Sequence, residues 1–98
     1  MAGASIQDRP PTEKELVEVS KHIGAGFELL GAYLGINSIK IQQIVMNNSF
    51  SVETQIFKIL VAWKQKEGRQ ATVRKLLEAV KNSPGNINVG EIERIFDT

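Results

Sequence analysis

Residues 51–68 read SVETQIFKILVAWKQKEG, and this stretch decides the fold. Its large apolar residues lie four, seven, eight and eleven positions after the first of them: Val52, Ile56, Ile59, Leu60 and Trp63. Because an α-helix has 3.6 residues per turn, these positions share one face. Ser51 can cap the start of such a helix, and Gly68 can end it in a left-handed conformation. We therefore predict a long helix that forms the centre of the core.

Five shorter segments show helical spacing of apolar residues, at about residues 13–23, 27–34, 38–46, 73–80 and 89–96. Residues able to cap these helices precede four of the segments: Thr12 (with Glu15), Asn37 or Ser38, Thr72, and Asn88 (with Glu91). No stretch alternates apolar and polar residues with a period of two, so we expect no sheet. The sequence predicts an all-α protein, a compact antiparallel bundle of six helices joined by short loops.

The predicted core consists of the apolar faces of these helices. The residues that we expect to be buried are Leu16, Phe27, Leu30, Ile41, Ile44, Ile56, Ile59, Leu60, Trp63, Leu76, Leu77 and Ile92.

The 98 residues suit one domain, which we place at residues 12–98. Residues 1–11 are small and polar and end in two prolines, which predicts a disordered leader. The sequence lacks the apolar run of a signal peptide and any segment of roughly 20 apolar residues that could span a membrane. We therefore expect a cytoplasmic domain without membrane contact.

Residues that could carry catalysis are scarce. The chain has no cysteine and one histidine, His22, which lies near the end of a predicted helix. The glycines at 24–26 follow no strand and precede no Gly-Lys-Ser/Thr motif, so they do not form a phosphate-binding loop. We expect no catalytic residues, no metal and no cofactor.

Charge is unevenly distributed along the chain. Residues 58–81 carry seven basic and two acidic groups, a net charge of +5, whereas residues 1–57 and 82–98 each carry a net charge of −2. The net charge of +1 therefore conceals a polarised surface rather than a uniformly basic protein.

The segment LVAWKQKEGRQATVRKLLEAV, residues 60–80, resembles the second half of a death domain. The matching positions are a Leu followed three residues later by Trp, a helix-ending Gly, an Ala-Thr pair and a Leu pair: Leu60, Trp63, Gly68, Ala71-Thr72 and Leu76-Leu77. IGAGFELLGAYLGI, residues 23–36, is similar to an upstream segment of the family, with Phe27 where many members have Trp. Ile41 and Ile44 match the family's paired apolar positions in the third helix.

The resemblance implies a Greek-key bundle, the death fold, that binds other death domains in apoptotic or inflammatory signalling. It also implies asymmetric contacts between two different patches, so that association with a second copy or another death domain propagates head to tail. One patch would combine the end of the fourth helix, the loop after it and the start of the fifth helix: Lys64, Lys66, Arg69, Arg74 and Lys75. The other would combine the loop before the sixth helix with its first turn: Asn86, Asn88, Glu91 and, at its edge, Glu93.

Nucleic-acid binding by the basic 64–75 segment is the alternative function. We favour protein binding, because these cations lie mostly at helix ends and in a loop and are flanked by acidic segments. Phe57 and Val61 form a second candidate contact, although burial beside the core is the simpler interpretation. Ile39 fits a buried or an exposed position equally well, and we expect Phe50 to tuck beneath the third helix.

Overall fold

The computed structural model describes residues 6–97, which form six α-helices and two short 3₁₀ helices and no strand. In chain order these are η1 (Ile6–Asp8), α1 (Glu13–Ser20), α2 (Phe27–Tyr33), α3 (Ser38–Asn47), α4 (Val52–Glu67), η2 (Gly68–Gln70), α5 (Val73–Asn82) and α6 (Val89–Ile95). The all-helical, six-helix prediction is therefore confirmed. A single isolated bridge joins Ile23 to Ile87 and ties the α1–α2 loop to the α5–α6 loop.

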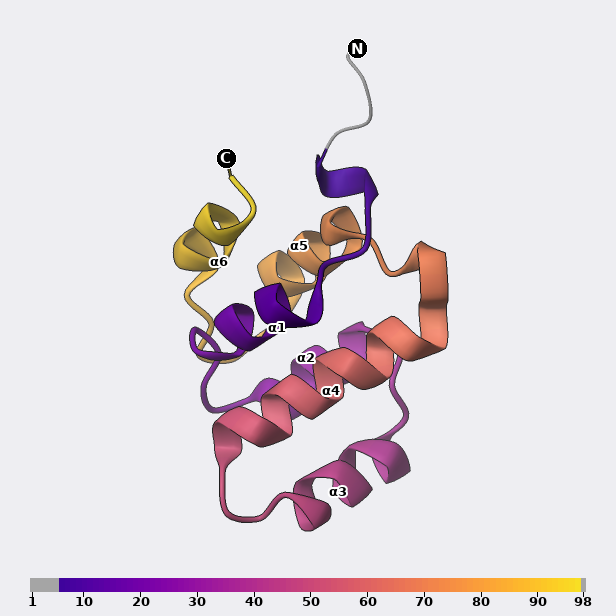
Figure 1. Cartoon of the computed structure of the whole chain (residues 1–98). Helices are drawn as coiled ribbons and strands as arrows, with labels where there is room; N and C mark the ends of the chain where they lie inside the picture. The colour runs from indigo at the N-terminus through magenta and orange to yellow at the C-terminus, as the bar shows by residue number, and fades with distance from the viewer. Residues whose placement is uncertain (1–5, 98) are drawn as a thin grey trace.

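Helix α4 is the central element, as its length and apolar stripe predicted. It packs against α1, α2 and α3, and Figure 1 shows α3 on one side of it and α1, α5 and α6 on the other. Trp63 is only 2% exposed. All twelve residues expected in the core are buried in one cluster, against which Phe57 and Val61 pack half-buried.

The helix ends follow the local signals in the sequence. Thr12 and Glu15 form a reciprocal capping box at α1. Ser51 accepts the Thr54 N–H at the start of α4, and Thr72 caps α5 in the same way. Gly68 ends α4 at φ 59° and ψ −126°, so it is not in the left-handed helical conformation that we expected. That region of backbone space still strongly favours glycine.

The corner between α3 and α4 differs from the prediction. Phe50 is fully exposed instead of tucking beneath α3, and Val52 is 54% exposed although it continues the apolar stripe of α4. Both lie where α4 begins, beyond the reach of the helices that cover its middle. Ile39, on the outer face of α3, is also exposed.

The expected disorder of residues 1–11 is wrong for residues 6–11, whereas residues 1–5 lie outside the described part of the chain. The η1 helix packs against α5, and the Val73 N–H donates to the Arg9 carbonyl at 2.8 Å. Pro11 is fully buried. Residues 6–11 therefore form a strap across α5, and we call them the N-terminal strap.

The strap is held to α1 by an ion pair. The Arg9 Nη1 and Nη2 atoms donate to the two carboxylate oxygens of Glu15 at 2.9 and 2.7 Å. The Thr12 N–H also donates to Glu15, at 2.8 Å. These hydrogen bonds, the Arg9 one foremost, favour the ionised carboxylate and lower the pKa of Glu15 to about 2.

Candidate protein-binding surface

The five predicted basic residues come from three consecutive elements. Lys64 and Lys66 lie in the last turn of α4, Arg69 lies in η2, and Arg74 and Lys75 lie in the first turn of α5. Gly68 ends α4 and Thr72 caps α5, so these two residues fix where the three elements begin and end. The structure thus places the five cations around one corner of the bundle, which we call the basic corner.

The two helix ends at the basic corner differ in whether the helix dipole favours a cation there. Lys64 and Lys66 lie at a helix C-terminus, where the backbone dipole favours cations. Arg74 and Lys75 lie at a helix N-terminus that has no acidic residue in its first turn. The dipole disfavours cations there. Helix stability alone therefore accounts for the two α4 lysines but not for the two α5 cations.

Two of the five cations are already engaged within the molecule. Arg74 donates to the Asp8 carboxylate of the N-terminal strap at 2.9 and 3.2 Å. The Lys66 Nζ donates to the Gly35 carbonyl at 2.6 Å and lies 3.6 Å from the Glu67 carboxylate. The side chains of Lys64, Arg69 and Lys75 have no ion-pair partner among residues 6–97. These three supply the free positive charge of the basic corner.

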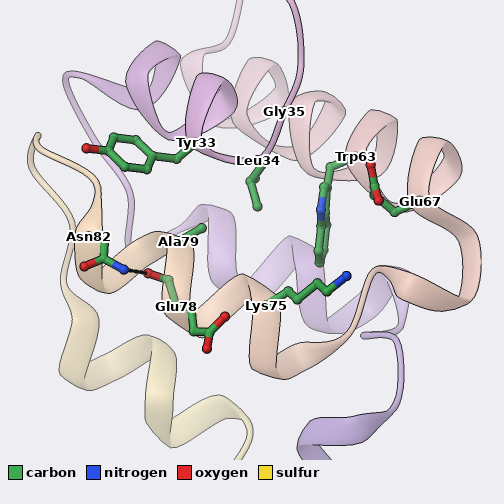
Figure 2. Close-up of a pocket in the computed structure, with 9 residues that line it drawn as sticks. All are labelled: Tyr33, Leu34, Gly35, Trp63, Glu67, Lys75, Glu78, Ala79 and Asn82. Atoms are coloured by element: carbon green, nitrogen blue, oxygen red, sulfur yellow. Dashed lines mark hydrogen bonds between the residues drawn. The ribbon is translucent and has the colours of Figure 1, made fainter.

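A surface hollow of about 390 Å³ adjoins the basic corner. It is lined by Tyr33, Leu34, Gly35, Trp63, Glu67, Lys75, Glu78, Ala79 and Asn82. Figure 2 shows the Lys75 side chain extending beneath the edge of the Trp63 ring, with Tyr33 at the far end of the hollow. The hollow therefore joins a free cation to an exposed aromatic ring and two carboxylates.

Sequence reasoning missed the hollow. Lys75, Glu78 and Asn82 lie three and seven positions apart on α5, so helical spacing could have placed them on one exposed face. Tyr33 gave no such signal, because α2 meets α5 only in the folded chain.

The predicted acidic patch is less negative than its sequence suggests. Glu91 lies 3.5 Å from Arg94, and Glu93 lies 3.2 Å from Lys81. Asn88 caps α6 by accepting the Glu91 N–H at 3.3 Å. Within the described chain, each carboxylate of this patch therefore has a cation nearby.

Asn86, the remaining residue of that patch, has a structural role through its backbone. Its N–H donates to the Ala25 carbonyl at 2.9 Å, and its carbonyl accepts the Gly24 N–H at 2.7 Å. The α1–α2 and α5–α6 loops are thereby joined. The structure thus shows Asn86 and Asn88 organising the loop and the helix start that carry Glu91.

The two patches are separated by the length of α5. The basic corner includes the first turn of this ten-residue helix, and the acidic patch follows its last turn. At 1.5 Å per residue, α5 is roughly 15 Å long. The basic corner and the start of α6 therefore lie toward opposite ends of this helix.

Among residues 6–97, no group of three His, Cys, Asp or Glu side chains could hold a metal ion.

No helix in the same part of the chain is long and apolar enough to cross a membrane.

Comparison with known families identifies the fold. The model of the death-domain family matches residues 13–84. The chain belongs to the death-domain family. Its six-helix bundle is consistent with the death fold, and the family consists of non-catalytic modules that bind other proteins of the death-fold class.

Two curated relatives are similar over most of this death domain. THO complex subunit 1 of Mus musculus is 29% identical over 77 residues, which cover 79% of this chain and 12% of the relative. THO complex subunit 1 of Homo sapiens is 27% identical over 77 residues with the same coverage. The matched part of this chain therefore spans about an eighth of the length of these relatives.

Proposed function

We propose that this death domain is a non-catalytic module that assembles with other death domains, or with copies of itself, through two asymmetric charged patches. The basic corner of one molecule meets the acidic patch around Glu91 of the next. In the family this kind of assembly serves apoptotic and inflammatory signalling in the cytoplasm. The relatives' names describe subunits of a complex, which agrees with a role in assembly.

The observation that carries the proposal is the free charge of the basic corner. Lys64, Arg69 and Lys75 have no ion-pair partner among the described residues, and Lys75 lies at a helix start that disfavours cations. A carboxylate from a neighbouring molecule would pair with these cations and would also interact favourably with the α5 dipole.

The separation of the patches determines the geometry of assembly. The two patches lie toward opposite ends of α5 on one molecule. The molecules therefore need not pair as a twofold dimer. Each molecule can instead offer its basic corner to one neighbour and its acidic patch to another, which generates an open chain. Rim charge pairs contribute about 0–1 kcal/mol each, so several pairs together must set the affinity and the register.

The test reverses two of the three free cations and leaves the engaged ones in place. Arg69→Glu combined with Lys75→Glu should weaken self-association, measured by light scattering at low salt, without lowering the unfolding midpoint. Mixing this variant with a second variant that carries Glu91→Lys should restore part of the association. The control is Lys40→Glu with Lys58→Glu, which makes the same charge change at two lysines of α3 and α4 that belong to neither patch.

The result that would overturn this proposal is association of the Arg69/Lys75 variant as strong as that of the wild-type protein at low salt. If the wild-type protein does not self-associate, the same variants are tested by pull-down against a panel of other death domains. Titration with a random DNA duplex tests the alternative. Binding that is lost on reversal of the basic corner and that weakens steeply with salt would favour nucleic acid over protein.

A further inference from the structure

Two surface hollows lie along the junction of α3 and α4, on a different side of α4 from α1. Their volumes are about 190 and 380 Å³, and Lys40 and Ala62 line both. Because they share two lining residues, the hollows adjoin each other, and we call the pair the α3–α4 groove. Figure 1 shows α3 below α4, which are the two helices that line the groove.

The floor of the groove combines apolar and polar residues. Its apolar part consists of Ile36 and Ile44, which are buried, and Val61 and Ala62, which are half-buried. Its uncharged polar part consists of Asn37, Asn47, Asn48 and Gln65. Lys58, Val61, Ala62 and Gln65 lie at offsets of zero, three, four and seven on α4, which places them on one face. Ala62 lines both hollows, so it lies where they adjoin.

The rim of the groove is positively charged. Lys40 from α3 and Lys58 from α4 both line it, and neither has an ion-pair partner in residues 6–97. Lys66 lines one end but already donates to the Gly35 carbonyl. No Asp or Glu lines either hollow. Apolar residues beside unpaired cations are complementary to a ligand that carries apolar groups and carboxylates together.

We propose that the α3–α4 groove binds an acidic peptide segment of a partner protein, with small apolar side chains on the floor and carboxylates at Lys40 and Lys58. This surface goes beyond the proposed head-to-tail contact, since it needs neither the free cations of the basic corner nor the patch around Glu91. It provides a second, independent binding mode, toward a linear segment rather than a folded death domain.

The lining favours a peptide over a nucleic acid. Single-stranded nucleic acids are held by aromatic or arginine side chains that stack on the bases. Neither hollow of the groove is lined by an aromatic residue or an arginine. Leu or Ala side chains of a peptide would lose water against Ile36 and Ile44, whereas a phosphate group would gain nothing from these two residues.

Fluorescence polarisation with a labelled model peptide tests the proposal. The probe is a short helical peptide with Leu along one face and Glu on both sides of it, and the matched probe has every Glu replaced by Gln. Lys40→Glu combined with Lys58→Glu should weaken binding of the Glu peptide about tenfold or more, since two attractive charge pairs are each replaced by repulsion. It should have little effect on the Gln peptide.

Two further variants separate location from overall charge. Ala62→Gln keeps the net charge but places a longer side chain where the two hollows adjoin, so it should also weaken binding of the Glu peptide. Lys14→Glu with Lys21→Glu makes the same charge change on α1 and at its C-terminal cap, and should leave binding nearly unchanged. Backbone amide NMR shifts on adding the peptide should concentrate at α3 and at the 58–65 face of α4.

Several outcomes would overturn the proposal. One is equal binding of the Glu peptide by the wild-type protein and the Lys40/Lys58 variant, and another is an equal loss of binding in the α1 control. NMR shifts confined to η2 and the start of α5 would assign the peptide to the basic corner instead. Failure of the peptide to bind, together with binding of a single-stranded oligonucleotide that Ala62→Gln abolishes, would assign the groove to nucleic acid.

Discussion

Replacement of Glu15 by Gln should destabilise the domain at neutral pH by about 1–2 kcal/mol. The change keeps the side chain's size, and Gln can retain the capping hydrogen bond from the Thr12 N–H. It removes the charge that accepts two hydrogen bonds from Arg9, at 2.9 and 2.7 Å. The pKa of Glu15 falls from its ordinary 4.5 to about 2, and each pH unit of such a change corresponds to about 1.4 kcal/mol. We reduce that full value because the Arg9 side chain is 37% exposed and water screens the pair.

The pH dependence has a definite sign. Because folding lowers the pKa of Glu15, its contribution is complete above about pH 4.5 and is lost as the pH falls toward about 2. The difference in unfolding free energy between wild type and Glu15→Gln should therefore be constant above about pH 5 and shrink to nearly zero near pH 2. Urea denaturation followed by Trp63 fluorescence at a series of pH values measures this difference.

Glu13→Gln provides the matched control. Glu13 lies in the first turn of the same helix and is exposed, so its removal should cost only the helix-dipole contribution of a few tenths of a kcal/mol. The reasoning would be refuted if Glu15→Gln unfolds at the wild-type urea concentration at pH 7. A difference between wild type and variant that persists undiminished to pH 2 would refute it equally, because the contribution would then not come from the charge.

Three further substitutions test the packing and a loop. Trp63→Ala should cost roughly 3–5 kcal/mol, because it empties the space of a buried aromatic side chain, whereas Phe50→Ala should change stability by less than about 0.5 kcal/mol. Similar urea midpoints for the two variants would contradict the assigned core. Gly26→Ala should cost on the order of 1–3 kcal/mol, since φ is +92° there and the new Cβ would lie 2.9 Å from the Gly85 Cα. A wild-type thermal midpoint for this variant would contradict that loop geometry.

Features set by neighbouring residues were predictable from the sequence. The caps at Thr12, Ser51 and Thr72 depend on hydrogen bonds that span three residues, so the signal and its partner appear together in the chain. The burial of Trp63 followed from periodicity, because the middle of a central helix is covered on several sides. Val52 has the same periodicity but is 54% exposed at the first residue of α4, and periodicity does not show where the cover of a helix ends.

Features set by distant residues were not predictable. The N-terminal strap looked disordered because residues 1–11 have few apolar groups, and what secures its described part is polar and long-range. Asp8 and Arg74 are 66 positions apart in the chain, and no local pattern links them. The α3–α4 groove likewise depends on how two helices lie side by side. No pattern in the sequence indicated that Lys40 and Lys58 would line the same hollow.

The net charge of +5 over residues 58–81 overstated the unpaired positive charge of the basic corner. The structure shows which of its cations are unpaired. Arg74 is paired with Asp8, and Lys66 is held by a backbone carbonyl, so neither is fully available to a partner. Lys64 is favoured by the dipole of its own helix. Lys75 is repelled by the α5 dipole, and Arg69 lies in the η2 turn just before that helix. A partner carboxylate beside these two residues would pair with both cations and meet a favourable helix N-terminus. Among the five basic residues, Arg69 and Lys75 should therefore contribute most to assembly.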